Sequence, residues 1–317
     1  ASGTNKNKAA VEVAVMNNTA VATVVTINNP ELVNMKDAEH FGTQAFNIEY
    51  EYEDKSKIGN GIVTLDGNTY ACVSKEAPLL QALQMDSKTL TVQTVGNIDC
   101  YLNTGIAGVN TQEINISSTS KVNVLNITCA SASYNGSYCT FRAVNPNAVM
   151  KFSNITLNKT ANTQTTWNTY NMEFYTDVEL TDCVIEHPVT FCTNAVVKNT
   201  TINGYRDTAD HYAVWQQANG TNVTFENCAI NGTRGIKIDE QYVTASPSTL
   251  VVKNSAFATT GSKSAILVKS SAKVDITLDN VVLTNVTADQ INAVWVDEDS
   301  AQYADLVTVT GGTVIVE

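Results

Sequence analysis

Apolar and polar residues alternate in short runs along most of this chain, and the alternation breaks at a recurring Asn. In the stretch VTFENCAI, Val223 and Phe225 precede Asn227, while Cys228 and Ile230 follow it. Two polar residues therefore separate Phe225 from Cys228, whereas a continuous strand places one residue between inward-facing neighbours. The phase shift predicts two strands joined by a bend at Asn227, since Asn tolerates the left-handed backbone conformation.

The same frame returns on a nearly fixed pitch, with steps of 29, 28, 28, 17, 28, 27 and 26 residues. The residues two before and three after each bend are apolar throughout. A period in this range predicts a solenoid, in which the bend side chains of successive coils are buried and hydrogen-bonded in a stack. The predicted ladder positions are Asn97, Asn126, Asn154, Asp182, Asn199, Asn227, Asn254 and Asn280.

This arrangement resembles the right-handed parallel β-helix of the pectin-lyase-like superfamily, whose coils carry an asparagine ladder at a tight bend. The resemblance covers residues 89–317 and implies an all-β solenoid. A leucine-rich repeat is the alternative, but Leu does not dominate the frame and no helical segment recurs. The 17-residue step from Asp182 to Asn199 requires either an unusually tight coil or a misassigned repeat.

The two ends of the chain depart from the repeat. We expect residues 1–10 to form a disordered tail and residues 11–88 to form an N-terminal cap with the first irregular coils. Within the cap, residues 75–86 carry Leu and Ala at helical spacing and predict one short amphipathic helix. At the other end Gly311 replaces the ladder residue, so a loop, further protein or a binding partner would cover the open end of the solenoid.

Composition limits the partners. The net charge of −12 argues against nucleic-acid binding, and the apolar runs are too short to span a membrane. Few charges and much Asn, Thr, Ser and Val are typical of a secreted or cell-surface protein, and we favour a bacterial one. The many Asn-x-Ser/Thr sequences are attributed to this composition rather than to glycosylation.

The seven cysteines do not form a dense disulfide pattern. Cys183 and Cys228 occupy inward positions and are expected to be buried thiols. Cys100 and Cys129 share one predicted column on adjacent coils, which leaves one optional disulfide open.

One face of the second strand of each coil could bind a ligand. The alternation predicts an outward column of Arg142, Tyr175, Trp215, Lys237, Leu267 and Trp295, with a neighbouring column of Asp177, Gln217, Asp239, Lys269 and Asp297. Aromatic rings stack on sugars and interleaved polar groups bind hydroxyls. The predicted glycan-binding residues are therefore Tyr175, Trp215, Gln217, Lys237, Asp239, Trp295 and Asp297. Packing of the aromatic rings beneath loops, with charges paired across strands, is the favoured alternative.

Catalysis is the competing hypothesis, either as a polysaccharide lyase or as a glycoside hydrolase. The candidates are Arg206, Asp210, His211, Lys237 and Asp239. Arg234 and Lys237 are similar to the Arg-x-Lys element of polygalacturonases, but with one extra residue between them. The Asn-Thr-Asp, Asp-Asp and Gly-His-Gly elements of those enzymes are missing. No cofactor is implied, and Ca²⁺ is the one ion that the lyase resemblance allows.

The sequence thus favours a non-catalytic module that binds polysaccharide or surface glycan, or serves as an adhesin or structural element. A phage tailspike-like protein is the third hypothesis.

Overall fold

The structure of the protein is a computed structural model. It describes residues 11–14, 22–27, 46–49, 60–102, 105–129, 139–159, 171–205, 211–217, 219–239, 246–260, 265–284, 294–296, 305, 307–311 and 314–316. The strands and the helix are β1 (Val11–Ala14), β2 (Thr23–Ile27), β3 (Phe46–Glu49), β4 (Gly61–Leu65), β5 (Asn68–Val73), α1 (Glu76–Ala82), β6 (Thr89–Thr94), β7 (Ile98–Leu102), β8 (Glu113–Ser118), β9 (Val124–Cys129), β10 (Cys139–Phe141), β11 (Val149–Ser153), β12 (Thr156–Lys159), β13 (Met172–Phe174), β14 (Asp177–Thr181), β15 (Val184–Ile185), β16 (Val189–Phe191), β17 (Ala195–Lys198), β18 (Thr201–Gly204), β19 (Tyr212–Gln217), β20 (Asn222–Glu226), β21 (Ala229–Gly232), β22 (Arg234–Asp239), β23 (Ser248–Thr259), β24 (Ile266–Lys269), β25 (Val274–Thr284), β26 (Val294–Val296), β27 (Val307–Thr310) and β28 (Val314–Val316).

The chain is an all-β solenoid of mostly parallel strands, as the repeat predicts, and it divides into two compact units. Unit 1 comprises residues 1–126 and 143–155, and unit 2 comprises residues 127–142 and 156–317. In unit 1, β6, β8 and β11 pair in parallel, and β4 and β5 form an antiparallel hairpin. The hairpin turns at Asp66 and Gly67, which both have positive φ.

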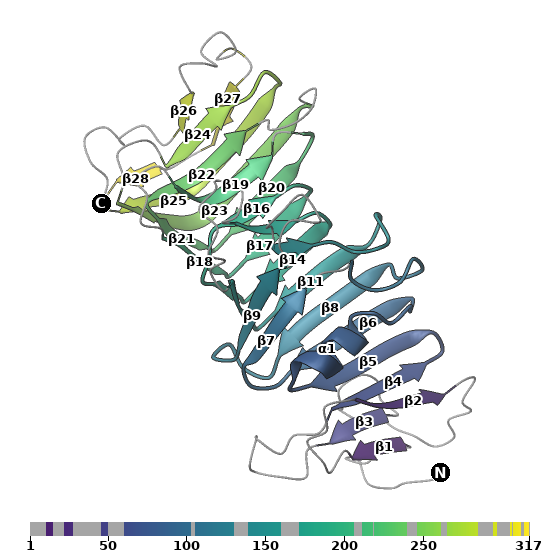
Figure 1. The fold of residues 1–317 in the computed structure, drawn as a ribbon. Coiled ribbons are helices and arrows are strands. Elements are labelled where there is room, and N and C mark those ends of the chain that lie inside the picture. Colours follow the sequence, from purple (N-terminus) through teal and green to yellow (C-terminus); the bar gives the residue numbers. More distant parts are fainter. Residues whose placement is uncertain are drawn as a thin grey trace, which may run out of the picture. The chain divides into compact units, whose positions relative to one another are not determined.

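In unit 2, corresponding strands of successive repeats lie side by side in register (Figure 1). One row runs β14, β17, β20, β23 and β25, and a second row beyond the bend runs β15, β18 and β21 before joining β23. A separate seven-stranded sheet contains β10, β13, β16, β19, β22, β24 and β26. The 17-residue step is a real tight coil, because Val178 pairs with Ala195 and Ile185 with Ile202.

The predicted bends are confirmed at six positions, all with φ between 47° and 56°: Asn154, Asp182, Asn199, Asn227, Asn254 and Asn280. The amide of Asn227 donates to Asn199 Oδ1 at 3.3 Å, and that of Asn280 donates to Asn254 Oδ1 at 2.9 Å. The predicted burial is wrong, because Asn199, Asn227, Asn254 and Asn280 are exposed. The left-handed residue occupies the outer side of the bend, so its side chain points away from the core.

Two ladder assignments are wrong. Asn126 lies within β9 between the buried residues Leu125 and Ile127, and its amide bonds to Asp99. In unit 1 the ladder position belongs to Ser118, whose backbone oxygen accepts from the Asn154 amide at 2.9 Å. The bend before β7 has its positive φ at Gly96 rather than at Asn97.

The predicted ladder position at Gly311 is also wrong. Val281 pairs with Val314, which places Gly311 two residues before the ladder position.

The residue after each of the six bends points into the core, and at two of them a hydroxyl there bonds to the preceding coil, which the sequence prediction missed. Ser255 Oγ donates to the Lys253 carbonyl at 2.7 Å and accepts the Cys228 N–H at 3.0 Å. Thr200 Oγ1 likewise donates to the Lys198 carbonyl and accepts the Cys183 N–H. The left-handed bend rotates the following N–H out of the strand-to-strand pattern, and a small hydroxyl on the next coil satisfies it.

Aromatic stacking fills the core beside the seven-stranded sheet. The ring centroids of Phe141 and Phe174 lie 4.9 Å apart, and those of Phe174 and Phe191 lie 5.6 Å apart. All three rings are fully buried.

The predicted short helix is confirmed as α1, which buries Pro78, Leu79 and Ala82. No helix in the described part of the chain is both long and apolar enough to cross a membrane. Residues 1–10 lie outside the described residues, and the cap function of residues 11–88 stays a prediction.

The expected thiols are confirmed at Cys183 and Cys228, which are free and buried. The optional disulfide is wrong, because Cys100 is also a free thiol.

Candidate functional site

The outer face of the seven-stranded sheet carries most of the predicted ligand-binding residues. Trp215, Lys237, Leu267 and Trp295 occupy paired positions on β19, β22, β24 and β26, so this part of the predicted column is correctly aligned. Gln217, Asp239 and Lys269 are aligned beside it. The side chain of Trp295 and the whole of Asp297 lie outside the described residues.

Three predicted members of these columns, Arg142, Tyr175 and Asp177, lie elsewhere. The residue that continues the Trp215 column onto β13 is Glu173, because Glu173 pairs with Thr190 and Thr190 pairs with Trp215. Tyr175 follows the end of β13, and the Arg142 guanidinium lies 6.0 Å from its ring centroid. Asp177 belongs to β14 in the other sheet, where its carboxylate accepts from Asn194. The chain turns after Phe174, so alternation does not carry across this point.

The predicted aromatic and charged residues pair with one another. Lys237 Nζ lies 2.6 Å from Asp239 Oδ2 and 4.3 Å from the Trp215 ring centroid. The Lys237 and Asp239 side chains are only 19% and 12% exposed. The ammonium neutralises the carboxylate and covers one ring face, so this cluster has the character expected of internal packing.

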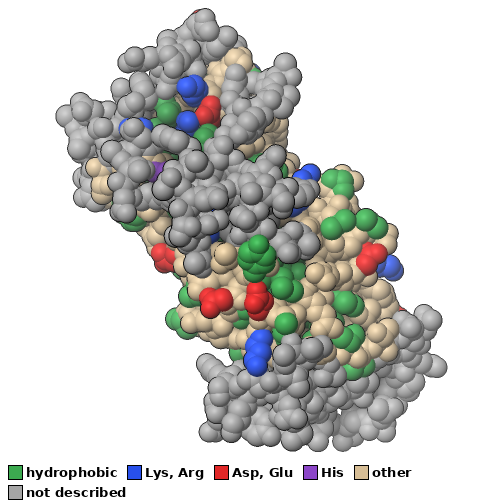
Figure 2. Space-filling view, in the orientation of Figure 1, with side chains coloured by type: hydrophobic (Ala, Val, Ile, Leu, Met, Phe, Trp, Pro, Cys, Tyr) green, Lys and Arg blue, Asp and Glu red, His purple; other side chains and the backbone are tan. Residues whose placement is uncertain are grey.

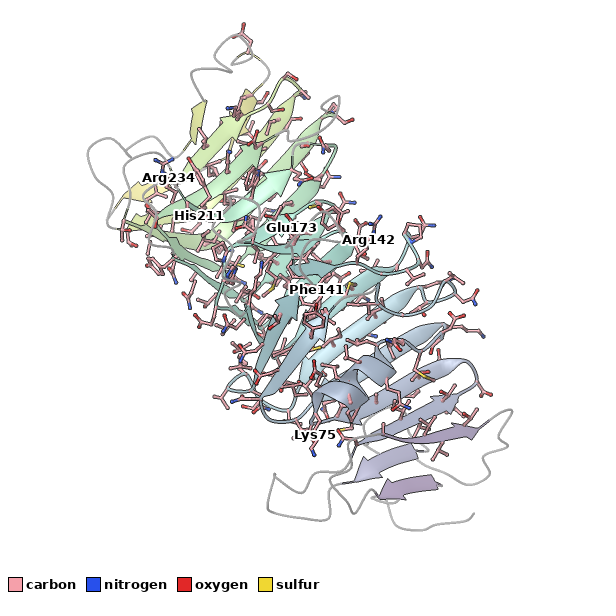
Figure 3. The ribbon with its side chains drawn as sticks, in the orientation of Figure 1. Lys75, Phe141, Arg142, Glu173, His211 and Arg234 are labelled. Atoms are coloured by element: carbon pink, nitrogen blue, oxygen red, sulfur yellow. The ribbon has the colours of Figure 1, made fainter. Side chains whose placement is uncertain are left out.

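Two of the predicted catalytic residues form the ion pair described above, and a third, His211, contacts Tyr212 and Arg234. Arg206 and Asp210 lie outside the described residues. His211 is half-buried, with Nδ1 3.0 Å from the Tyr212 carbonyl oxygen, and its own carbonyl accepts the Arg234 N–H. Arg234 is 6% exposed, and its guanidinium lies 5.4 Å from the Tyr212 ring centroid. Figure 3 labels His211 and Arg234 among the side chains of this region.

Sequence reasoning missed a buried polar cluster around Glu173 (Figure 3). Glu173 is 6% exposed although it lies on the outer face of β13. Burial raises its pKa to about 7, while a hydrogen bond with Tyr175 and the charge of Lys159 act in the opposite direction. The available signal was the place of Glu173 between the apolar residues Met172 and Phe174, which the fixed-pitch alignment obscured.

The outer side of the bend forms a second candidate surface, a groove of about 350 Å³. Its ladder side is formed by Asn199, Asn227, Asn254 and Asn280. Small residues of the following strand form the rest of its lining: Thr200, Thr201, Cys228, Ala229, Ser255, Ala256 and Val282. Every lining residue is uncharged, and the exposed amides offer both hydrogen-bond donors and acceptors.

Charged side chains are spread over the face that Figure 2 shows, and the described acidic and basic side chains do not gather into one patch there. Within the described ranges, no three His, Cys, Asp or Glu side chains lie close enough together to hold a metal ion.

Comparison of the chain with known protein families, with curated proteins and with solved structures finds no match in any of the three.

Proposed function

We propose that this protein is a secreted or cell-surface β-helix module of pectin-lyase-like type that binds neutral polysaccharide along the asparagine groove, without cleaving it. The observation that carries the proposal is the groove itself, in which four exposed Asn side chains follow one another on successive coils. Successive coils are about 4.8 Å apart, so the amides form a regular row of donors and acceptors. A polymer with regularly spaced hydroxyls is the ligand class that suits such a row.

The uncharged lining selects between glycan classes. An acidic polysaccharide needs Lys or Arg to bind its carboxylates, and none of the groove residues is basic. The net charge of −12 also repels a polyanion. A neutral glycan matches both observations. Location outside the cell is supported by composition alone.

The spacing of carboxyl groups favours binding over hydrolysis on the seven-stranded sheet. Glu173 lies on β13 and Asp239 lies on β22, with β16 and β19 between them. Three strand spacings amount to roughly 14 Å. Paired glycosidase carboxyls lie about 5–9.5 Å apart. Asp239 is also held by Lys237, which makes it a poor partner for acid–base chemistry.

Asn→Asp substitutions test the groove without changing the backbone preference. Asp182 already occupies a ladder position with φ 56° and does not line the groove, so Asp fits the bend. We expect Asn227→Asp and Asn254→Asp to weaken binding on an array of neutral polysaccharides at least tenfold, with little change in thermal stability. Asp182→Asn is the matched control and should bind like wild type. Unchanged binding by the variant that carries both Asn227→Asp and Asn254→Asp would refute the groove as the ligand site.

A further inference from the structure

Three side chains with complementary chemistry are buried together in unit 2. Lys159 ends β12, Asn171 directly precedes β13, and Glu173 lies in the middle of β13. They are 4%, 7% and 6% exposed, respectively. Lys159 Nζ lies 3.3 Å from the backbone oxygen of Asn171, so the amine is next to the residue that carries the amide. Glu173 pairs with Thr190, the residue to which the Asn171 side chain donates, so the carboxyl and the amide belong to the neighbours of one residue.

The Asn171 amide is oriented by one strong contact. Its Nδ2 donates to Thr190 Oγ1 at 2.8 Å, and Thr190 is 1% exposed. Its Oδ1 and the Oε2 of Glu173 are both buried and have no hydrogen-bond partner. A buried carboxyl takes up a proton more readily than an exposed one, and a protonated carboxyl can donate to an amide oxygen. A protonated Glu173 is therefore suited to polarise the amide carbonyl of Asn171.

We propose that Lys159 and Asn171 form an intramolecular isopeptide bond, with Glu173 carrying the protons. In the proposed step, the neutral Lys159 amine attacks Cγ of Asn171, and the Nζ–Cγ bond forms. Glu173 donates its proton towards the amide oxygen and recovers one from the attacking nitrogen. The Cγ–Nδ2 bond then breaks, the proton passes to Nδ2, and one ammonia molecule leaves. The carboxyl is regenerated and nothing is oxidised or reduced.

The surroundings favour this reaction over the charged resting state. An ammonium and a carboxylate buried together lose their hydration, and proton transfer between them yields the neutral amine and the carboxylic acid that the reaction needs. Burial also holds the reacting groups in one place, which replaces a bimolecular encounter by an intramolecular one. The bond would close residues 159–171 into a ring that no reductant opens. The inference does not depend on glycan binding.

Mass spectrometry of the intact, denatured wild-type chain tests the proposal. The expected mass is the sequence mass minus one ammonia molecule, and a mass equal to that of the sequence would overturn the proposal. Trypsin should fail to cleave after Lys159, giving one peptide over residues 152–198. Chymotrypsin cleavage at Trp167 or Tyr170 should then add water without separating the two fragments. Loss of ammonia mapped instead to an Asn-Gly sequence, as a succinimide, also overturns it.

Variants assign the roles. Lys159→Arg and Glu173→Gln should both restore the full sequence mass, apart from the substituted atoms. Lys198→Arg is the matched control, since its ion pair with Glu226 is on the surface, and it should still lose ammonia. Circular dichroism shows whether each variant is folded. If a variant is not folded, the proteolytic fragments of the wild-type chain test the proposed bond without it. A folded Glu173→Gln protein that still loses ammonia would refute the role of Glu173.

Discussion

Replacing Asn227 separates the role of the backbone from that of the amide ladder. Asn227 has φ 55° and its side chain is exposed. An L-residue other than Asn, Asp or Gly in this conformation costs about 1–2 kcal/mol. The exposed amide bond to Asn199, at 3.3 Å, adds about 0.5 kcal/mol or less. We expect Asn227→Ala to lower the free energy of unfolding by about 1–2 kcal/mol.

Asn227→Gly is the informative control, because Gly adopts positive φ freely but lacks the amide. Its expected loss is within about 0.5 kcal/mol. The assay is urea denaturation of wild type and both variants, with free energies taken from the midpoint and slope of the first transition. Equal destabilisation by Ala and Gly would refute the backbone argument and show that the amide ladder supplies most of the stability at this bend.

Three further predictions concern buried polar groups. Ser255→Ala should lower the free energy of unfolding by about 1–3 kcal/mol in the same assay, because it leaves the buried Cys228 N–H without its acceptor. Ser255→Cys should recover part of that loss, because Cys occupies this column on other coils. Glu173 takes up a proton on folding, so its contribution to stability is present below pH 4.5 and is lost as pH rises to about 7. Between pH 5 and pH 8 the free energy of unfolding of wild type should therefore fall by on the order of 3 kcal/mol more than that of Glu173→Gln. An equal dependence of the two free energies on pH would contradict the buried-carboxyl argument. Cys183 and Cys228 are buried, and burial also raises the pKa of the Cys228 thiol, so both should react with a thiol reagent at pH 8 only after denaturation. Rapid labelling of either residue in the native protein, located by peptide mapping, would contradict their burial.

The repeat was predictable where one residue type marks every bend. From Asn154 onwards the bend requires positive φ, and Asn or Asp meets that requirement in each described coil. In unit 1 the same position holds Ser118, 36 residues before Asn154. A fixed pitch therefore selected Asn126, whose apolar neighbours belong to an ordinary strand.

The candidate site was less predictable for two physical reasons. Alternation identified Trp215, Lys237 and Asp239 as outward positions but could not tell that they neutralise and cover one another. The short coil that contains β15, β16 and β17 shifts the alignment, so Glu173 took a position that the pattern gave to Tyr175. The groove exists because the left-handed Asn side chains point outward. The sequence prediction placed these side chains in the core and therefore missed it.

Binding of neutral oligosaccharides of increasing length is the most direct test of the proposed function. Three coil spacings separate Asn199 from Asn280, which gives the groove a length of roughly 14 Å. Titration calorimetry should find an affinity that rises with each added sugar until the ligand spans this length and then levels off. Absence of binding at every length, or an affinity that does not depend on length, would contradict recognition along the asparagine groove.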